Sequence, residues 1–132
     1  MTENDISRIV IDAAIKVHRH IGPGLLETVY ESILTYELEE RRLKVARQVP
    51  VPIHYRHICL DEGFRADLVV EDKLIIELKS VESLARVHKK QLLTYLRMSE
   101  LRLGVLLNFG APLIKEGICR VANGIEDIRN KI

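Results

Sequence analysis

The chain has 132 residues, of which 47% are hydrophobic and 30% charged, and its formal net charge is +1. This length suits one domain with a sizeable core, which we expect to span residues 1–132. The near-neutral charge excludes a disordered or strongly basic polypeptide, so any contact with nucleic acid must come from a local basic patch. The polar, acidic N-terminus and the lack of a long apolar run predict a cytoplasmic protein without a membrane span.

Helical periodicity dominates the first third of the chain. Thr2 and Asp5 have the spacing of a capping box. Apolar residues then recur at helical spacing, namely Ile6, Ile9, Val10, Ala13, Ala14, Val17 and Ile21. Gly22-Pro23-Gly24 ends this helix and precedes a second one, which we expect from about residue 25 to 43. Its inward side chains are predicted to be Leu26, Val29, Ile33 and Leu38.

The start of the second helix carries a carboxylate and a tyrosine. If Gly24 is the N-cap, Glu27 is the third helical residue, where the helix dipole favours a negative charge and the side chain can bond back to the N-cap amide. Tyr30 follows three residues later on a neighbouring part of the same face. This local role of Glu27 requires no active site.

Strands are predicted in the middle of the chain. Residues 45–55 alternate in part, but Pro50 and Pro52 exclude a regular central strand and favour an edge or bulged one. Residues 58–60 continue it before an expected turn at Asp61-Glu62-Gly63. Residues 64–70 and 74–79 are two alternating runs around a short polar turn, which is the pattern of a β-hairpin.

The length of the hairpin connection decides which side chains meet. A three-residue connection, 71–73, opposes Asp67 to Glu77, whereas a two-residue connection would put these carboxylates on opposite faces. Arg65 and Lys79 then share the carboxylate face. The other face is apolar and contains Ala66, Leu68, Ile76 and Leu78.

Asp67 and the Glu77-Leu78-Lys79 segment together suit metal-dependent cleavage of phosphodiester bonds. Two carboxylates can hold a hard cation such as Mg²⁺ through oxygen, and an ammonium group can orient or help deprotonate the attacking water. The same residues also fit an exposed cross-strand ion cluster on an amphipathic hairpin. Local pattern alone leaves both interpretations open.

The remaining elements are a helix and one or two strands. Ser83 can cap a third helix that ends near Ser99 or Glu100. One stripe of this helix carries His88, Gln91 and Tyr95, beside the basic residues Arg86, Lys89, Lys90 and Arg97. On local grounds this is a half-buried polar seam next to a solvated charged face.

Two strands are predicted after the third helix. Residues 101–107 are almost continuously apolar, as in a strand buried on both faces, and a last short strand is expected around residues 117–121. With helices on both sides of the sheet, the order of elements predicts an α/β fold, a three-layer αβα sandwich with a central mixed β-sheet.

These residues resemble the motifs of a known group of enzymes. Asp67, then Glu77-x-Lys79, then Gln91-x-x-x-Tyr95 are similar to the PD-(D/E)xK nuclease superfamily, including the Gln-x-x-x-Tyr element of its RecB-like branch. Each motif is short, but together they stand in the right order on the right elements. The resemblance implies an αβββαβ, restriction-endonuclease-like core.

The chain resembles one subgroup of this superfamily more closely. Gly24-x-x-Glu27-x-x-Tyr30 is similar to the motif after which the GxxExxY proteins are named, and the resemblance extends from about residue 9 to 121. Ala66 stands where the superfamily name has proline. Proline contributes turn shape and no ligand, so its loss leaves the chemistry in place.

The resemblance also implies a metal and roles for individual residues. Mg²⁺, with Mn²⁺ as a substitute, would be held by Asp67 and Glu77. The backbone carbonyl of Leu78 and the carboxylate of Glu27 would be further ligands, and Lys79 would position the attacking water. The implied activity is endo- or exonucleolytic hydrolysis of phosphodiester bonds.

Nucleic acid is the implied partner, with DNA favoured over RNA. Substrate contacts are expected from Gln91, Tyr95, Tyr30, Arg65, His88, Lys89 and Lys90. A chain of this size would depend on a homodimer or on a larger nucleic-acid-processing complex for target choice. The alternative interpretation is a nucleic-acid-binding or partner-binding module that keeps the fold without turnover, and uptake of Mg²⁺ or Mn²⁺ distinguishes the two.

Overall fold

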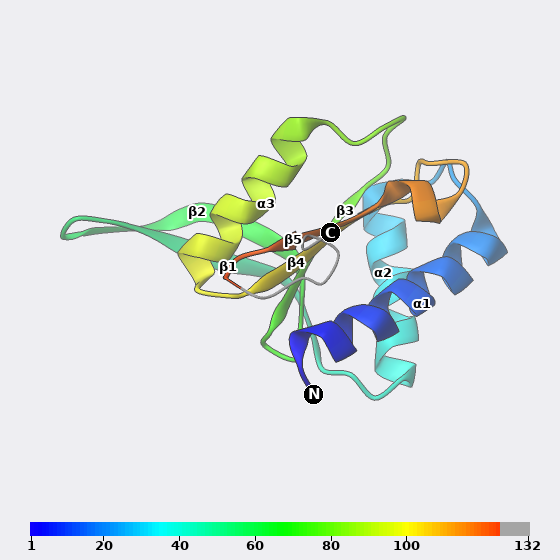
Figure 1. Ribbon diagram of the computed structural model, residues 1–132, viewed down its shortest axis with the longest axis horizontal. Coiled ribbons are helices and arrows are strands. Elements are labelled where there is room, and N and C mark those ends of the chain that lie inside the picture. The colour runs from blue at the N-terminus through cyan, green and yellow to red at the C-terminus, as the bar shows by residue number, and fades with distance from the viewer. Residues whose placement is uncertain (125–132) are drawn as a thin grey trace.

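A five-stranded mixed sheet in the order β1-β2-β3-β4-β5 forms the centre of the computed structural model, which describes residues 1–124 (Figure 1). The strands are β1 (Val45–Tyr55), β2 (Ile58–Val70), β3 (Leu74–Lys79), β4 (Leu103–Asn108) and β5 (Ile118–Ala122). The helices are α1 (Glu3–Ile21), α2 (Glu27–Glu40), α3 (Arg86–Ser99) and the short 3-10 helix η1 (Ile114–Gly117). Only β3 and β4 are parallel, because α3 connects them as a crossover.

Helices cover both faces of the sheet, which confirms the predicted three-layer sandwich (Figure 1). The larger core lies between the sheet and α1 and α2, and it includes Ile6, Val10, Leu34, Leu38, Leu68, Ile76, Leu78 and Phe109. The smaller core lies under α3 and contains Ala66, Ile75, Leu92, Leu96 and Leu106. All six residues of β4 are buried, as the apolar run predicted. No helix within residues 1–124 is both long and apolar enough to cross a membrane.

The two N-terminal helices follow the predicted pattern with different boundaries. The capping box of α1 is confirmed, because the Asp5 amide donates to Thr2 Oγ1 at 3.2 Å and the Thr2 amide to Asp5 Oδ2 at 3.0 Å. The predictions for Leu26 and Val29 were wrong, since these side chains are 73% and 38% exposed. The second helix begins at Glu27, two residues later than expected, and its buried stripe consists of Tyr30, Glu31, Leu34, Thr35 and Leu38.

Tyr30 explains how this stripe is oriented. Its ring is fully buried and stacks on Phe109 with the ring centroids 4.4 Å apart. The hydroxyl donates to the Gly22 carbonyl at 2.6 Å and accepts from the Leu25 amide at 3.2 Å. Tyr30 therefore holds the connection between α1 and α2 against Phe109, which directly follows β4.

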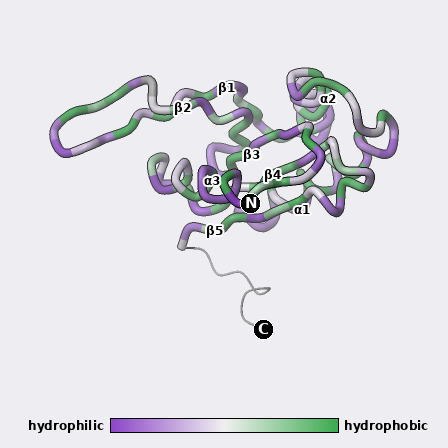
Figure 2. The backbone as a smooth tube through the Cα atoms, turned by 90° about the horizontal axis from the view of Figure 1, so that it is seen from above, coloured by the Kyte–Doolittle hydropathy of each residue, from purple (hydrophilic) through white to green (hydrophobic). Residues whose placement is uncertain are grey.

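The strands β1 and β2 form a long hairpin that projects from the body of the molecule (Figures 1 and 2). β1 is an edge strand with a register shift between Val51 and Ile53, as its prolines predicted. The turn expected at residues 61–63 was wrong, because β2 begins at Ile58 and the hairpin turns at residues 56–57. In this part of the sheet β1 and β2 pair only with each other, so the hairpin projects as a two-stranded arm.

The third helix begins later than predicted. It starts at Arg86 with Ala85 as N-cap, and the Ala85 amide donates to Nδ1 of His88 at 3.1 Å. The capping role expected of Ser83 was therefore wrong, because the imidazole of His88 takes it. The predicted end of the helix at Ser99 is confirmed.

Asn108 fixes the chain that follows β3. Its side chain is 1% exposed, Oδ1 accepts from the amides of Val81 and Gly110 at 3.0 and 3.1 Å, and Nδ2 donates to the Val81 carbonyl at 2.9 Å. A Cβ added at Gly110 would collide with the backbone of Val81, so glycine is required for this close approach. The end of β3, at Lys79, is thereby held against the end of β4.

We predict that Asn108→Ala lowers the free energy of unfolding by roughly 2–4 kcal/mol, because it leaves backbone groups of Val81 and Gly110 without partners. Urea unfolding measures the change. Asn108→Asp is the comparison variant: a protonated carboxyl can still accept from the amides and donate to the Val81 carbonyl, whereas an ionised one cannot donate and is buried, so its loss should be smaller at pH 4 than at pH 8. An unchanged midpoint for Asn108→Ala would contradict this role.

Candidate active site

The β2–β3 hairpin has the register that its three-residue connection predicted. The paired residues are Val70 with Leu74, Val69 with Ile75, and Leu68 with Ile76. No residue of β2 before Leu68 pairs with β3. In that part β2 pairs only with β1, within the arm, and the rest of β3 pairs only with β4. Asp67 is the first residue of β2 beyond the last pair, so it lies where the two strands diverge.

Asp67 and Glu77 meet at this point of divergence. Oδ2 of Asp67 accepts from the Leu78 amide at 2.8 Å, and Oε1 of Glu77 accepts from the Asp67 amide at 3.3 Å. Each carboxylate thus binds a backbone amide of the opposite strand, where a ladder hydrogen bond would otherwise be. The prediction that the hairpin brings these two carboxylates together is confirmed.

The backbone of β3 also faces this gap. The Leu78 amide points toward β2, where it meets Asp67, whereas the Lys79 carbonyl points toward β4 and accepts from the Phe109 amide at 2.8 Å. The amide and carbonyl of one residue in a strand face the same edge. The Leu78 carbonyl therefore faces the side of Asp67, which agrees with the ligand role expected of it.

Glu77 is a buried acid without a cationic partner. Its side chain is 8% exposed, and burial, followed by the negative charge of Asp67, raises its pKa from 4.5 to about 8. The Asp67 amide and the charge of Lys79 oppose this rise. No ion pair within residues 1–124 involves Glu77 or Asp67. Two close carboxylates that lack a counter-charge are the electrostatic setting that a bound cation relieves.

The donor set fits a hard divalent cation of the Mg²⁺ type. In the part of the chain that the structure describes, no group of three or more His, Cys, Asp or Glu side chains is placed to hold a metal. The ligands on offer are therefore the carboxylates of Asp67 and Glu77 and the Leu78 carbonyl. Mg²⁺ commonly binds through one or two carboxylates and completes its shell with water and substrate phosphates.

Glu27 lies at the end of β3 and not with the carboxylate pair. It is the first residue of α2, with Leu26 as N-cap, so the expected third position and the bond to a Gly24 amide were wrong. Its Oε2 instead accepts from the Ser80 amide at 3.1 Å, next to Lys79. A surface pocket of about 590 Å³ adjoins this contact and is lined by Gly24, Leu25, Leu26, Glu27, Thr28 and Ser80.

Lys79 and Tyr95 lie close to the carboxylates. Lys79 is the half-buried last residue of β3, near enough for its charge to act on the pKa of Glu77. Tyr95, on α3, stacks on Phe64 with ring centroids 3.6 Å apart. Its pKa is raised by burial and then by the charges of Glu77 and Asp67, so its hydroxyl is near enough for these charges to act on it. Gln91 precedes Tyr95 by one helical turn and is exposed.

The other residues expected at the substrate lie at different places. Tyr30 is a core residue whose hydroxyl bonds are internal, so a substrate contact is excluded in this conformation. His88 caps α3 and lies within about 20° of Tyr95 around the helix, so its substrate role stays a prediction. Lys89 and Lys90 are exposed, but they lie about 120–140° around the helix from Tyr95, because successive residues turn by about 100°.

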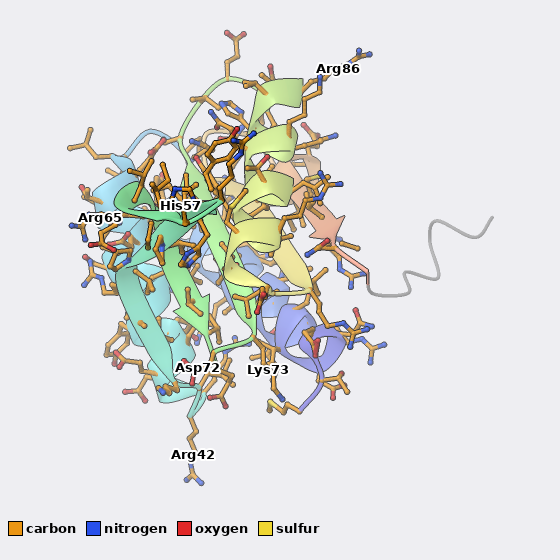
Figure 3. The ribbon with its side chains drawn as sticks, turned by 90° about the vertical axis from the view of Figure 1, so that its left-hand side faces the viewer. Arg42, His57, Arg65, Asp72, Lys73 and Arg86 are labelled. Carbon is orange, nitrogen blue, oxygen red and sulfur yellow. The ribbon has the colours of Figure 1, made fainter. Side chains whose placement is uncertain are left out.

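Arg65 was expected on the carboxylate face, and this was wrong. Its neighbours Phe64 and Ala66 both pack on the α3 side, so by alternation Arg65 points away from α3, as Figure 3 shows. Ala66 was likewise expected beside Leu68 but lies in the other core. A regular strand keeps residues i and i+2 on one face, so β2 must rotate between Ala66 and Leu68.

The cause of this rotation lies in β1. Gln48 has a φ of +50°, in the left-handed region. Arg47 pairs with Leu68 and Val49 pairs with Ala66, but Gln48 and Asp67, which lie between these two pairs, are not paired. The two strands therefore change faces together at this point. Asp67 lies at the change, so its side chain reaches the gap beside β3.

Sequence reasoning missed a polar network behind Asp67. Glu31 of α2 is 6% exposed and accepts from Arg47, at 3.1 Å from Nε and 2.9 Å from Nη2. Its other oxygen accepts from Nε2 of Gln48 at 2.5 Å, and the same Nε2 lies 3.4 Å from Oδ1 of Asp67. One signal was present in the sequence, because Glu31 occupies the same helical stripe as Leu34 and Leu38.

The fold and this carboxylate pair define a protein of the restriction-endonuclease-like class. The family model described as the PD-(D/E)XK nuclease superfamily matches residues 4–121. The chain therefore belongs to this superfamily, whose members generally use divalent metals and bind nucleic acid. Searches of curated proteins and of solved structures found no match. Membership of the GxxExxY subgroup stays a prediction.

The raised pKa of Glu77 predicts a specific pH dependence of stability without metal. The folded state keeps the Glu77 proton up to about pH 8, whereas the unfolded chain releases it near pH 4.5. The folded state then binds more protons across this window, so the free energy of unfolding should fall as pH rises from about 5 to 8.

Thermal unfolding in EDTA from pH 5 to 8.5 measures this slope. Other groups titrate in the same range, so the difference between the unmodified protein and Glu77→Gln isolates the contribution of Glu77. We expect a flatter profile for Glu77→Gln. Removal of the repelling charge in Asp67→Asn should also raise the melting temperature near pH 8. Parallel profiles for all three proteins would contradict the assignment.

Proposed function

We propose that this protein is a divalent-metal-dependent nuclease that hydrolyses phosphodiester bonds, with DNA as the favoured substrate and RNA as the alternative. The observation that carries the proposal is the close pair of a buried Glu77 and a half-buried Asp67, which forms no ion pair within residues 1–124 and lies beside Lys79. Such a pair is costly to keep in a folded protein unless a cation balances it.

Asp67 and Glu77 would hold Mg²⁺, or Mn²⁺ in its place, and the Leu78 carbonyl faces the same gap. When bound, the cation would polarise the scissile phosphate and stabilise the charge that develops on it. The hydrogen bonds from the Leu78 and Asp67 amides hold the two carboxylates in place before any metal arrives. The protein's own contribution is this fixed placement of oxygen ligands.

Lys79 is the residue proposed to act on the nucleophile. It lies at the end of β3. The two residues that follow it are held in place, because Glu27 accepts from the Ser80 amide and the Asn108 side chain bonds the amide and carbonyl of Val81. An ammonium held there would orient the attacking water and support the developing negative charge. In this arrangement Glu27 is a positioning residue that anchors Ser80, next to Lys79.

The α3 side would contact the nucleic acid. The charges of Glu77 and Asp67 act on the Tyr95 hydroxyl, so from this position it would donate to a phosphate oxygen bound near the pair. Gln91 is exposed one turn earlier on the same stripe and would reach the adjoining nucleotide. Lys89 and Lys90 would contribute long-range attraction to phosphates from farther around the helix.

We predict that Lys79→Ala abolishes cleavage and spares both the fold and Mn²⁺ uptake, because Lys79 is not a ligand. Asp67→Ala and Glu77→Ala should instead weaken Mn²⁺ binding. The measurements are calorimetric titration with Mn²⁺ and cleavage of labelled single-stranded, double-stranded and branched DNA and of RNA, with Mg²⁺, Mn²⁺ or EDTA.

Lys73→Ala is the matched control for this experiment. Lys73 precedes β3 at the end opposite Lys79, where it donates to the Met1 carbonyl, and Figure 3 shows it near the lower edge of the molecule. Its variant should cleave normally. Full turnover by Lys79→Ala would contradict the mechanism, and an unmodified protein that takes up no Mn²⁺ would indicate the non-catalytic binding module.

Metal uptake should depend on pH in the direction set by Glu77. Near pH 6 the carboxyl of Glu77 holds a proton that a cation must displace, whereas at pH 8 about half of the population has lost it. We predict tighter Mn²⁺ binding at pH 8 than at pH 6, by roughly tenfold or more, with proton release on binding. Titrations in buffers of different ionisation enthalpy measure the released proton. Binding that is equally tight at both pH values would contradict this coupling.

A further inference from the structure

The most unusual backbone position near the site is Gln48. It lies inside the edge strand β1 with a φ of +50°, which residues with a Cβ rarely adopt. Such conformations are energetically costly and persist where the surrounding structure imposes them, often at functional sites. Gln48 is neither a glycine nor part of a turn, so the contacts of its side chain are what account for this conformation.

The side chain of Gln48 joins two carboxylates from different layers. Its Nε2 is 2.5 Å from Oε1 of Glu31, on α2, and 3.4 Å from Oδ1 of Asp67, on β2. The left-handed backbone is what turns this side chain out of the regular alternation of β1. Asp67 is thereby contacted on both of its oxygens, by Gln48 on Oδ1 and by the Leu78 amide on Oδ2.

The chemistry of the network suits a positioning role. Glu31 is nearly buried, and Arg47 balances its charge through two hydrogen bonds, so Glu31 serves as a fixed acceptor. Gln48 is neutral, and its amide group supplies two donor hydrogens, one for each carboxylate. An amide at this position restrains Asp67 without cancelling the negative charge that a cation needs. An arginine or lysine would compete with the metal instead.

We propose that Gln48 is a positioning residue that orients Asp67 for metal binding, with Glu31 and Arg47 as its fixed support. The inference rests on the proposed nuclease function and assigns a role to residues outside the superfamily motifs present in this chain. Partners of this kind hold metal ligands in place, and their loss typically weakens metal affinity or activity by about 10–100-fold.

The test compares Gln48→Gly with Arg42→Gly. Both positions have a positive φ, 50° and 64°, so glycine relieves the backbone equally in each variant. Arg42 is exposed and projects from the far end of the molecule (Figure 3). Only Gln48→Gly removes the amide beside Asp67. Gln48→Asn is a second variant, because asparagine tolerates the left-handed region but its side chain is shorter by one methylene.

Two readouts separate this inference from the proposed function. In metal-free protein, hydrogen exchange of the Leu78 amide reports whether Asp67 still accepts from it, and we expect about tenfold faster exchange in Gln48→Gly and unchanged exchange in Arg42→Gly. With Mn²⁺, calorimetry should show at least tenfold weaker binding for Gln48→Gly and Gln48→Asn.

The outcomes are distinct. Equal Leu78 exchange in Gln48→Gly and the unmodified protein would overturn the positioning role, whatever the metal data show. Faster exchange with unchanged Mn²⁺ affinity would overturn the link to metal binding. An unmodified protein that binds no Mn²⁺ and cleaves nothing would overturn the proposed function, and with it the metal part of this inference, while the exchange data would still decide whether Gln48 restrains Asp67.

Discussion

The divergence of β2 from β3 after Leu68 is the constraint on which the site depends. Where two strands separate, their facing amides lose ladder partners, and an unpaired amide in a half-buried place is costly. Here the carboxylates of Asp67 and Glu77 take up the amides of Leu78 and Asp67. The same bonds that close the gap in the sheet therefore bring two carboxyl groups together, and the raised pKa of Glu77 follows from burial and then from this closeness.

The surrounding elements each stabilise one side of this gap. On the β3 side, Asn108 and Glu27 fix the chain just after Lys79. On the β2 side, the left-handed Gln48 turns both strands of the arm, so that Phe64 meets Tyr95 under α3 while Leu68 stays in the core under α1 and α2. The rotation therefore places Phe64 and Ala66 of β2 in the smaller core under α3.

Much of the fold and the centre of the site could be predicted from the sequence, because local rules decide them. Parity fixed the register of Asp67 against Glu77, and the apolar run of β4 indicated a strand buried on both faces. The errors at Arg65 and Ala66 share one cause, since alternation assumes a regular strand and no local signal marks a left-handed glutamine. The exposure of Leu26 likewise depends on a distant residue, Phe109, against which Tyr30 stacks.

The roles of individual site residues depend on contacts that span the chain, which short motifs do not encode. Glu27 was expected among the metal ligands, yet its partner is the Ser80 amide, fifty-three positions away. Glu31 was overlooked because a single acid on a helix is usually exposed, and only Arg47 and Gln48 make its burial tolerable. The central pair was predictable because both of its members lie in one hairpin.

The prolines of β1 have a consequence for how copies of this protein meet. Pro50 and Pro52 lie on an edge strand, and proline has no amide hydrogen to offer a further strand. An exposed edge with a full row of donors is a template for aggregation, whereas this one is interrupted along its length. Sheet extension through β1 is therefore disfavoured, so two copies that join their sheets would have to pair through β5, the edge strand at the other side of the sheet.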